Sequence, residues 1–216
     1  MLKEQIELLK KEVIEYSLFI ENIIKNNIEG IEKNNRDILI QIIEKDEPKT
    51  NLIEIEIENK CIDLIARYQP KAIDLRMIIM SLKMNNDLER IADHSANIAN
   101  SSLYIIERPE IKEMKSIKRM SDEVLDMFED SIKSFIQMNA NLASAVYKRD
   151  DYIDKLRLTI LKSLIGTIRT NPDNVESIFH IERITKNLER IADLTTNLCE
   201  DIIFIVEGKI IKHKNL

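Results

Sequence analysis

The chain has 216 residues, of which 44% are apolar and 32% charged, with only three glycines and four prolines. Few helix breakers in a chain rich in Ile, Leu, Lys and Glu favour long helices over a sheet. The formal net charge is −6, from 32 basic and 38 acidic residues, which argues against non-specific nucleic-acid binding because that needs a basic surface.

Prolines and Asn-rich turns divide the chain into six expected helices. Their ranges are 2–32, 37–68, 70–107, 110–138, 142–169 and 172–207. Pro48 falls inside the second helix and predicts a bend there, because proline removes a backbone donor and clashes with the preceding turn. Pro172 is expected at the first turn of the sixth helix, where the missing donor costs nothing.

The two halves of the chain repeat. The segment Leu88–Asp93 reads Leu-Glu-Arg-Ile-Ala-Asp and recurs unchanged as Leu188–Asp193. The offset between halves is 100 residues at this motif and 104 in the earlier helices, so the second half is shorter by about one helical turn. We predict an all-α fold of two tandem antiparallel three-helix bundles produced by internal duplication, with domains at residues 1–108 and 109–216.

Cysteine usage and hydropathy bound the location. Cys61 and Cys199 form no CxxC pair, which argues against a thiolate zinc site and fits a reducing cytoplasm. The N-terminus leads into an amphipathic helix and not a signal peptide. The longest apolar run, Ile202–Val206, has about five residues and predicts no membrane span.

Carboxylates follow the edge of the expected apolar face on the fourth and sixth helices. Glu189 and Asp193 are four residues apart, so their side chains project from successive turns. Asp122, Asp126 and Asp130 repeat at the same spacing, with no Lys or Arg among them. Like charges at this spacing destabilise a helix by a few tenths of a kcal/mol per pair. Because the first and third helices of a bundle run parallel, we expect the two sets to converge on a divalent cation or a small cluster of cations.

The first half carries a weaker copy of this pattern. Glu89 and Asp93 are present, but the offset of 104 residues places Leu18, Asn22 and Asn26 where the second half has aspartates. An amide offers a neutral oxygen in place of a charge. We therefore expect the second half to bind metal more tightly than the first. The alternative interpretation is that all these acids form a solvated helix face.

Other chemistry has less support. Glu-x-x-His pairs, which a ferritin-like di-iron centre needs, are absent, as is a glycine-rich phosphate loop. The Ser and Cys residues have no paired base for nucleophilic catalysis. His94 follows Asp93 and is either a further metal ligand or a surface residue.

These features resemble the PhoU family of regulatory proteins of bacterial phosphate uptake, and the resemblance covers essentially the whole chain. It rests on the duplicated motif in a doubled three-helix pattern. The sequence segments that carry it are Gln69-Pro70, Asp74-Leu75-Arg76, 87–99 and 187–193.

The resemblance implies a metal site. Family members form two three-helix bundles, often as homodimers, and bind multinuclear iron or zinc clusters on the surface through E(D)xxxD motifs, with manganese or magnesium as further candidates. Asn22 and Asn26 depart from that motif. The matching pairs here are Glu89/Asp93, Glu189/Asp193, Asp122/Asp126 and Asp126/Asp130.

The resemblance also implies a non-enzymatic role. Members act as cytoplasmic adaptors that couple the ATPase of the phosphate ABC transporter to a sensor histidine kinase, which would place them at the inner membrane only through partners. They keep the phosphate regulon off when phosphate is plentiful, and so act as negative regulators. Two rival functions remain open: a carboxylate metalloenzyme such as a phosphohydrolase, and a purely structural helical module without metal.

Overall fold

The computed structural model describes residues 1–109 and 111–210, and within these ranges all regular structure is helical. The predicted all-α fold with a duplicated three-helix unit is confirmed. No helix in the described ranges is both long and apolar enough to cross a membrane. The elements are α1 (Leu2–Glu32), α2 (Arg36–Gln41), a π-helical turn η1 (Ile42–Asp46), α3 (Glu47–Tyr68), α4 (Ile73–Ile105), α5 (Met114–Gln137), α6 (Ala140–Tyr147), α7 (Asp150–Thr170), a 3₁₀ turn η2 (Pro172–Asn174) and α8 (Val175–Glu207).

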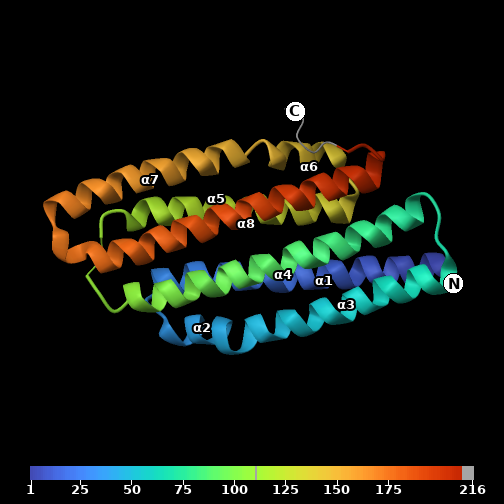
Figure 1. The fold of residues 1–216 in the computed structure, drawn as a ribbon, viewed down its shortest axis with the longest axis horizontal. Coiled ribbons are helices and arrows are strands. Elements are labelled where there is room, and N and C mark those ends of the chain that lie inside the picture. The colour runs from blue at the N-terminus through green and yellow to red at the C-terminus, as the bar shows by residue number, and fades with distance from the viewer. Residues whose placement is uncertain (110, 211–216) are drawn as a thin grey trace.

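The two bundles lie side by side. The first consists of α1, α2–α3 and α4, and the second of α5, α6–α7 and α8 (Figure 1). Helices α4 and α8 share the largest helix–helix interface, while α3 and α7 form the two outer edges (Figure 1). The bundles are thus joined through their third helices, the ones that carry the repeated motif.

Helices α4 and α8 run antiparallel. As the residue numbers increase along α4, the numbers of the residues that they contact decrease along α8. The Lys83 ammonium pairs with Asp201, and the Nδ1 atom of His94 lies 2.8 Å from the Asn187 side-chain oxygen. The stacked rings of Tyr104 and His180 follow at the far end, with centroids 4.0 Å apart. This pattern relates the two bundles by an approximate twofold axis that passes near the middle of both motifs.

Burial repeats between the bundles with the predicted offset. Eight buried positions of α1 recur 104 residues later as buried positions of α5. The pairs are Val13/Ile117, Tyr16/Met120, Ser17/Ser121, Ile20/Val124, Ile23/Met127, Ile24/Phe128, Asn27/Ser131 and Gly30/Ser134. Buried residues of α4 recur in α8 with the offset of 100, among them Leu88 and Leu188.

The second helix of each bundle is interrupted. In the first bundle the irregular turn η1 ends two residues before Pro48, so the helix is interrupted where the proline predicts a bend. The prediction of one helix over 142–169 is wrong, because α6 ends at Tyr147 and α7 begins at Asp150. Beyond this point buried positions such as Ile57 and Ile160 are offset by 103 residues. A π-helical turn adds one residue to an α-helix, which accounts for the change from 104.

The connections differ slightly from the predicted helix limits. Helix α4 begins at Ile73 and α5 at Met114, a few residues after the expected positions 70 and 110. Helix α3 ends because Gln69 adopts a left-handed conformation with φ +46°, and Ala72 also has a positive φ of 50°. These residues reverse the chain between α3 and α4, so Pro70 precedes the helix instead of opening it.

Equivalent asparagines begin the second helix of each bundle. The side-chain oxygen of Asn35 accepts hydrogen bonds from the backbone of Asp37 and Ile38, and that of Asn139 accepts from Asn141 and Leu142 at 3.1 Å each. These bonds satisfy amides that the helix itself leaves unpaired.

Replacing the cap residue should therefore weaken the fold. We expect Asn139→Ala to lower the free energy of unfolding by about 1 kcal/mol, measured by urea denaturation. Asn141→Ala, in the exposed first turn of the same helix, is the matched control and should change stability by less than half as much. Equal effects of the two substitutions would show that the cap does not contribute.

Candidate metal site

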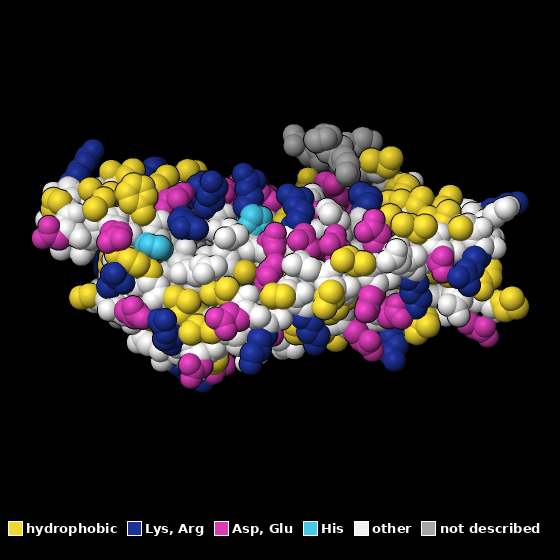
Figure 2. Space-filling view, turned by 60° about the horizontal axis from the view of Figure 1, so that its bottom comes forward, with side chains coloured by type: hydrophobic (Ala, Val, Ile, Leu, Met, Phe, Trp, Pro, Cys, Tyr) yellow, Lys and Arg dark blue, Asp and Glu magenta, His cyan; other side chains and the backbone are white. Residues whose placement is uncertain are grey.

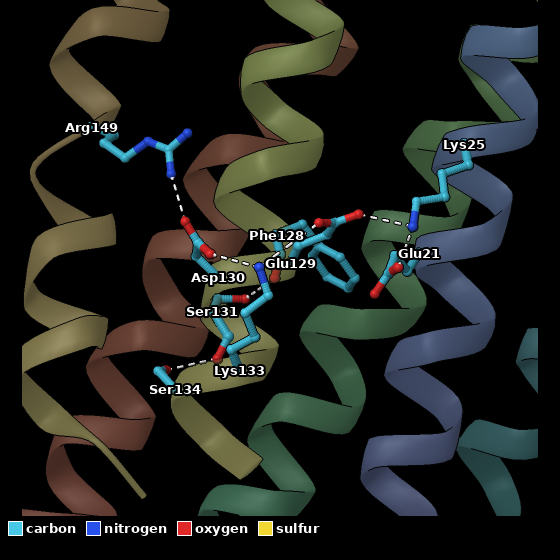
Figure 3. A network of polar contacts seen from close by, with 9 residues as sticks. All are labelled: Glu21, Lys25, Phe128, Glu129, Asp130, Ser131, Lys133, Ser134 and Arg149. Atoms are coloured by element: carbon cyan, nitrogen blue, oxygen red, sulfur yellow. Dashed lines mark hydrogen bonds and ion pairs between the residues drawn. The ribbon is translucent and has the colours of Figure 1, made fainter. Parts of the chain in front are cut away.

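Two of the three aspartates of α5, Asp122 and Asp130, are paired with cations, as is the neighbouring Glu129. The Lys25 ammonium of α1 lies 2.8 Å from Glu129, and Asp130 contacts both Lys133 and Arg149 at 3.0 Å (Figure 3). Asp122 lies 3.8 Å from Lys118. The repulsion within this acidic run is therefore relieved by cations, several of which come from distant parts of the chain.

The remaining aspartate of this set, Asp126, is exposed. It lies on α5 between the side that meets Lys25 and the side that meets Arg149. The structure thus gives Asp122 and Asp130 ion-pair partners, and within residues 1–109 and 111–210 it does not join the aspartates of α5 with Glu189 and Asp193 in a group that could hold a metal ion.

Glu189 and Asp193 of α8 instead face α7. Burial, together with the negative charges of Asp193, Asp154 and Glu189, raises the pKa of Asp150 to about 6. One carboxylate oxygen of Asp150 is buried without a hydrogen-bond partner. The second bundle therefore gathers four carboxylates between α7 and α8, two of which have the same i, i+4 spacing on α7.

An arginine lies among these carboxylates. The Arg157 guanidinium contacts both Glu182 and Glu189 at 3.2 Å, and Arg190 contacts Asp193 at 2.8 Å. Burial raises the pKa of Glu189, and Arg157 opposes that rise. The second bundle thus supplies part of its own positive charge.

The first bundle has a corresponding acidic cluster, which we call the α3–α4 cluster: Glu47, Glu54, Glu89 and Asp93. Burial, together with the charges of Asp93, Glu54 and Glu47, raises the pKa of Glu89 to about 7. The pKa of Asp93 is raised by burial and by Glu47. Burial also raises the pKa of the Tyr16 hydroxyl, which donates to the Thr50 carbonyl at 3.3 Å and feels the charge of Glu89.

The two clusters differ in charge at two positions of the second helix. With the offset of 103 residues that relates α3 to α7, Glu54 occupies the position of Arg157. The same offset places Asn51 at the position of Asp154, so each bundle gathers four carboxylates, but only the second has an arginine of its second helix among them. In the space-filling view, acidic side chains gather near the middle of the molecule, with Lys and Arg side chains beside them (Figure 2).

The first-bundle residues expected opposite the motif do not take part. Leu18 and Asn22 are exposed and Asn26 is half-buried on α1. The Nδ1 atom of His94 lies 2.8 Å from the Asn187 side-chain oxygen, across the interface between the bundles. That contact gives the histidine a structural partner.

No three His, Cys, Asp or Glu side chains in residues 1–109 and 111–210 are already arranged to hold one metal ion. The assignment of Asp122, Asp126, Asp130, Glu189, Asp193, Glu89 and Asp93 as metal ligands stays a prediction. The sequence reasoning missed the acids of the second helices, although Asp150 and Asp154 show the same i, i+4 spacing as the motif. Their position beside the motif depends on how α3 and α7 pack.

The chain matches the family model described as "PhoU domain" twice, at residues 13–102 and 117–202. The chain belongs to the PhoU family. Both matches lie inside the two predicted repeats, while the boundary between residues 108 and 109 itself stays a prediction.

Relatives in the PhoU family match this chain over nearly its full length. A "phosphate-specific transport system accessory protein PhoU homolog" of Aquifex aeolicus is 35% identical and covers 99% of this chain and 96% of its own. A homolog of Thermotoga maritima is 34% identical, covering 97% and 90%.

Solved PhoU structures share the fold. The crystal structure of PhoU from Pseudomonas aeruginosa superposes with a TM-score of 0.93 at 24% identity and covers 97% of this chain and 100% of its own. The phosphate transport system regulatory protein PhoU from Streptococcus pneumoniae superposes with a TM-score of 0.90 at 23% identity, covering 97% and 99%.

The raised pKa of Glu89 predicts a pH dependence of stability. Because folding raises this pKa from 4.5 to about 7, the fold favours the protonated acid, and stability declines as pH rises through that window. Glu89→Gln removes the penalty. We expect its Tm in chelator to exceed that of the wild type by about 1–3 °C above pH 7, and the two to converge below pH 4.5. A difference that is constant across this range would contradict the electrostatic explanation.

Proposed function

We propose that this protein is a non-enzymatic regulatory adaptor of bacterial phosphate homeostasis, acting in the cytoplasm as a negative regulator of phosphate uptake. The observation that carries the proposal is its membership of the PhoU family together with relatives, matched over 96% and 90% of their length, that are named accessory proteins of phosphate-specific transport. The partners would be the ATPase of the phosphate ABC transporter and, where present, the sensor histidine kinase of the phosphate regulon.

The form of the acidic clusters supports an adaptor over a hydrolase. Asp93 is exposed on α4 and Asp193 is about one-third exposed on α8, so the motifs lie on helix faces that a partner protein can reach. A carboxylate metalloenzyme needs an enclosed pocket around its metal. A metal on such a surface would fix the docking face for a partner.

We further propose that the α3–α4 cluster binds a divalent or trivalent metal, iron or zinc foremost, with manganese or magnesium as alternatives. Carboxylate oxygens are the ligands that hard cations prefer. Burial and neighbouring carboxylates raise the pKa values of Glu89 and Asp93, so both acids gain from a bound positive charge. The buried and unpaired oxygen of Asp150 fits the same chemistry in the second bundle.

The first bundle would then bind metal more tightly than the second, which reverses the order expected from sequence. That expectation depended on the aspartates of α5, whose charges pair with lysine and arginine. In the second bundle Arg157 already pairs with Glu182 and Glu189. A metal ion there would have to displace the guanidinium or bind next to its positive charge. In the first bundle Glu54 stands at the position of Arg157, and its carboxylate would not compete with a metal ion for the neighbouring acids.

The adaptor role predicts a specific association. We expect the tagged protein in its native cells to co-purify with the ATPase subunit of the phosphate transporter, and to do so more strongly when phosphate is plentiful. The matched control is the same tag on the Glu89→Gln/Asp93→Asn variant, which should recover less ATPase. Absence of the ATPase under both phosphate conditions would contradict the adaptor proposal.

The metal proposal predicts separate effects for two acidic regions. Metal at a hundredfold excess over its Kd should stabilise the wild type by about 2.7 kcal/mol, because it binds only the folded state. Glu89→Gln/Asp93→Asn should lose most of this gain together with metal content measured by elemental analysis. Asp126→Asn, on the exposed face of α5, should keep both. Loss of metal in Asp126→Asn alone would move the site to α5.

A further inference from the structure

A cavity of about 400 Å³ lies where the two bundles join, between the ends of α1 and α4 and the start of α5. This is the end of the molecule opposite to the N-terminus (Figure 1). Its walls are mainly apolar, formed by Ile28, Ile31, Ile105, Ile106, Met114 and Ile117. The volume falls within the range of about 300–1,000 Å³ that is typical of small-molecule sites.

The internal repeat allows the cavity to be compared with the equivalent place at the other end of the molecule, where the space is filled. The twofold relation between the bundles makes Ile132 and Phe135 the counterparts of Ile28 and Ile31, with the same offset of 104 residues. Ile132 and Phe135 are fully buried, and the Lys10 ammonium lies 5.8 Å from the centre of the Phe135 ring. At the other end Ile28 and Ile31 are only half-buried, so the smaller Ile31 leaves open a space that an aromatic ring fills in the second bundle.

The rim of the cavity is cationic. Three basic residues line it, Arg108, Lys115 and Lys118, against one acid, Glu32. Lys118 pairs with Glu32, and the Arg108 guanidinium lies 3.2 Å above the Tyr104 ring.

Lys115 is exposed and makes no ion pair within the described part of the chain. Its charge, together with the face of Arg108 that is turned away from the ring, is available to an anion. The cavity therefore combines an apolar interior with a net positive entrance.

We propose that this cavity binds a small amphipathic anion, a molecule with an apolar body and one acidic head group. The apolar body would fill the space beside Ile31, and the head group would lie against Lys115 and Arg108. Burial of the apolar body supplies most of the affinity, and the cations select the charge. Because residues of α1, α4 and α5 line the cavity, its occupant would contact both bundles.

The probe for this test is anilinonaphthalene sulfonate, which carries fused apolar rings and one sulfonate. We expect saturable fluorescence enhancement with one site per chain. Ile31→Phe, which copies the counterpart Phe135, should weaken binding by about tenfold because it removes the space. Lys115→Gln should weaken binding by up to about fivefold, because an exposed ion pair contributes at most about that factor to the affinity. The effect of this substitution should be smaller at high salt, which screens the charge.

The controls separate the cavity from other apolar surface. Phe179 is 65% exposed on α8, and Phe179→Ser should leave binding unchanged. Circular dichroism and Tm establish that Ile31→Phe is folded, and Lys115→Glu tests the rim without touching the core. Unchanged affinity in both Ile31→Phe and Lys115→Glu would overturn the proposal. Equal affinity for the uncharged phenylnaphthylamine would overturn the choice of an anion.

Discussion

The antiparallel packing of α4 against α8 is the constraint on which the rest of the structure depends. Leu88, Ile91 and Ala92 are buried on one helix, and their repeats Leu188, Ile191 and Ala192 on the other. Because each motif is buried on one face, its Glu and Asp must lie along the edge of that face, toward the neighbouring second helix. The contact that joins the bundles thus also decides where the carboxylates point.

Each motif consequently meets the second helix of its own bundle, and both second helices are interrupted just before that meeting point. The π-helical turn precedes Glu47, and the break at residues 148–149 precedes Asp150. The duplication has then diverged in charge: Arg157 contacts the second motif, whereas Glu54 adds a carboxylate to the first. Because of this divergence, the same fold has two acidic clusters with different charges beside the two copies of the motif.

Sequence periodicity and the repeat were sufficient to predict the helical architecture, the duplication and the outward carboxylates of the motifs. They did not predict the partners of those carboxylates. A helical wheel shows which face of a helix is polar but not which neighbouring helix that face contacts. The ion pairs that Lys25 and Arg149 make with acids of α5 were therefore not predicted. Asp150 and Glu47 join their clusters only because α7 and α3 pack beside the motifs.

The most direct test of this account is the position of bound metal in crystals grown with zinc or manganese, located by anomalous scattering at the absorption edge of the metal. The account predicts the strongest peak between α3 and α4, within coordination distance of Glu89 and Asp93, and a weaker or absent peak beside Arg157. A dominant peak on α5 among Asp122, Asp126 and Asp130 would contradict it.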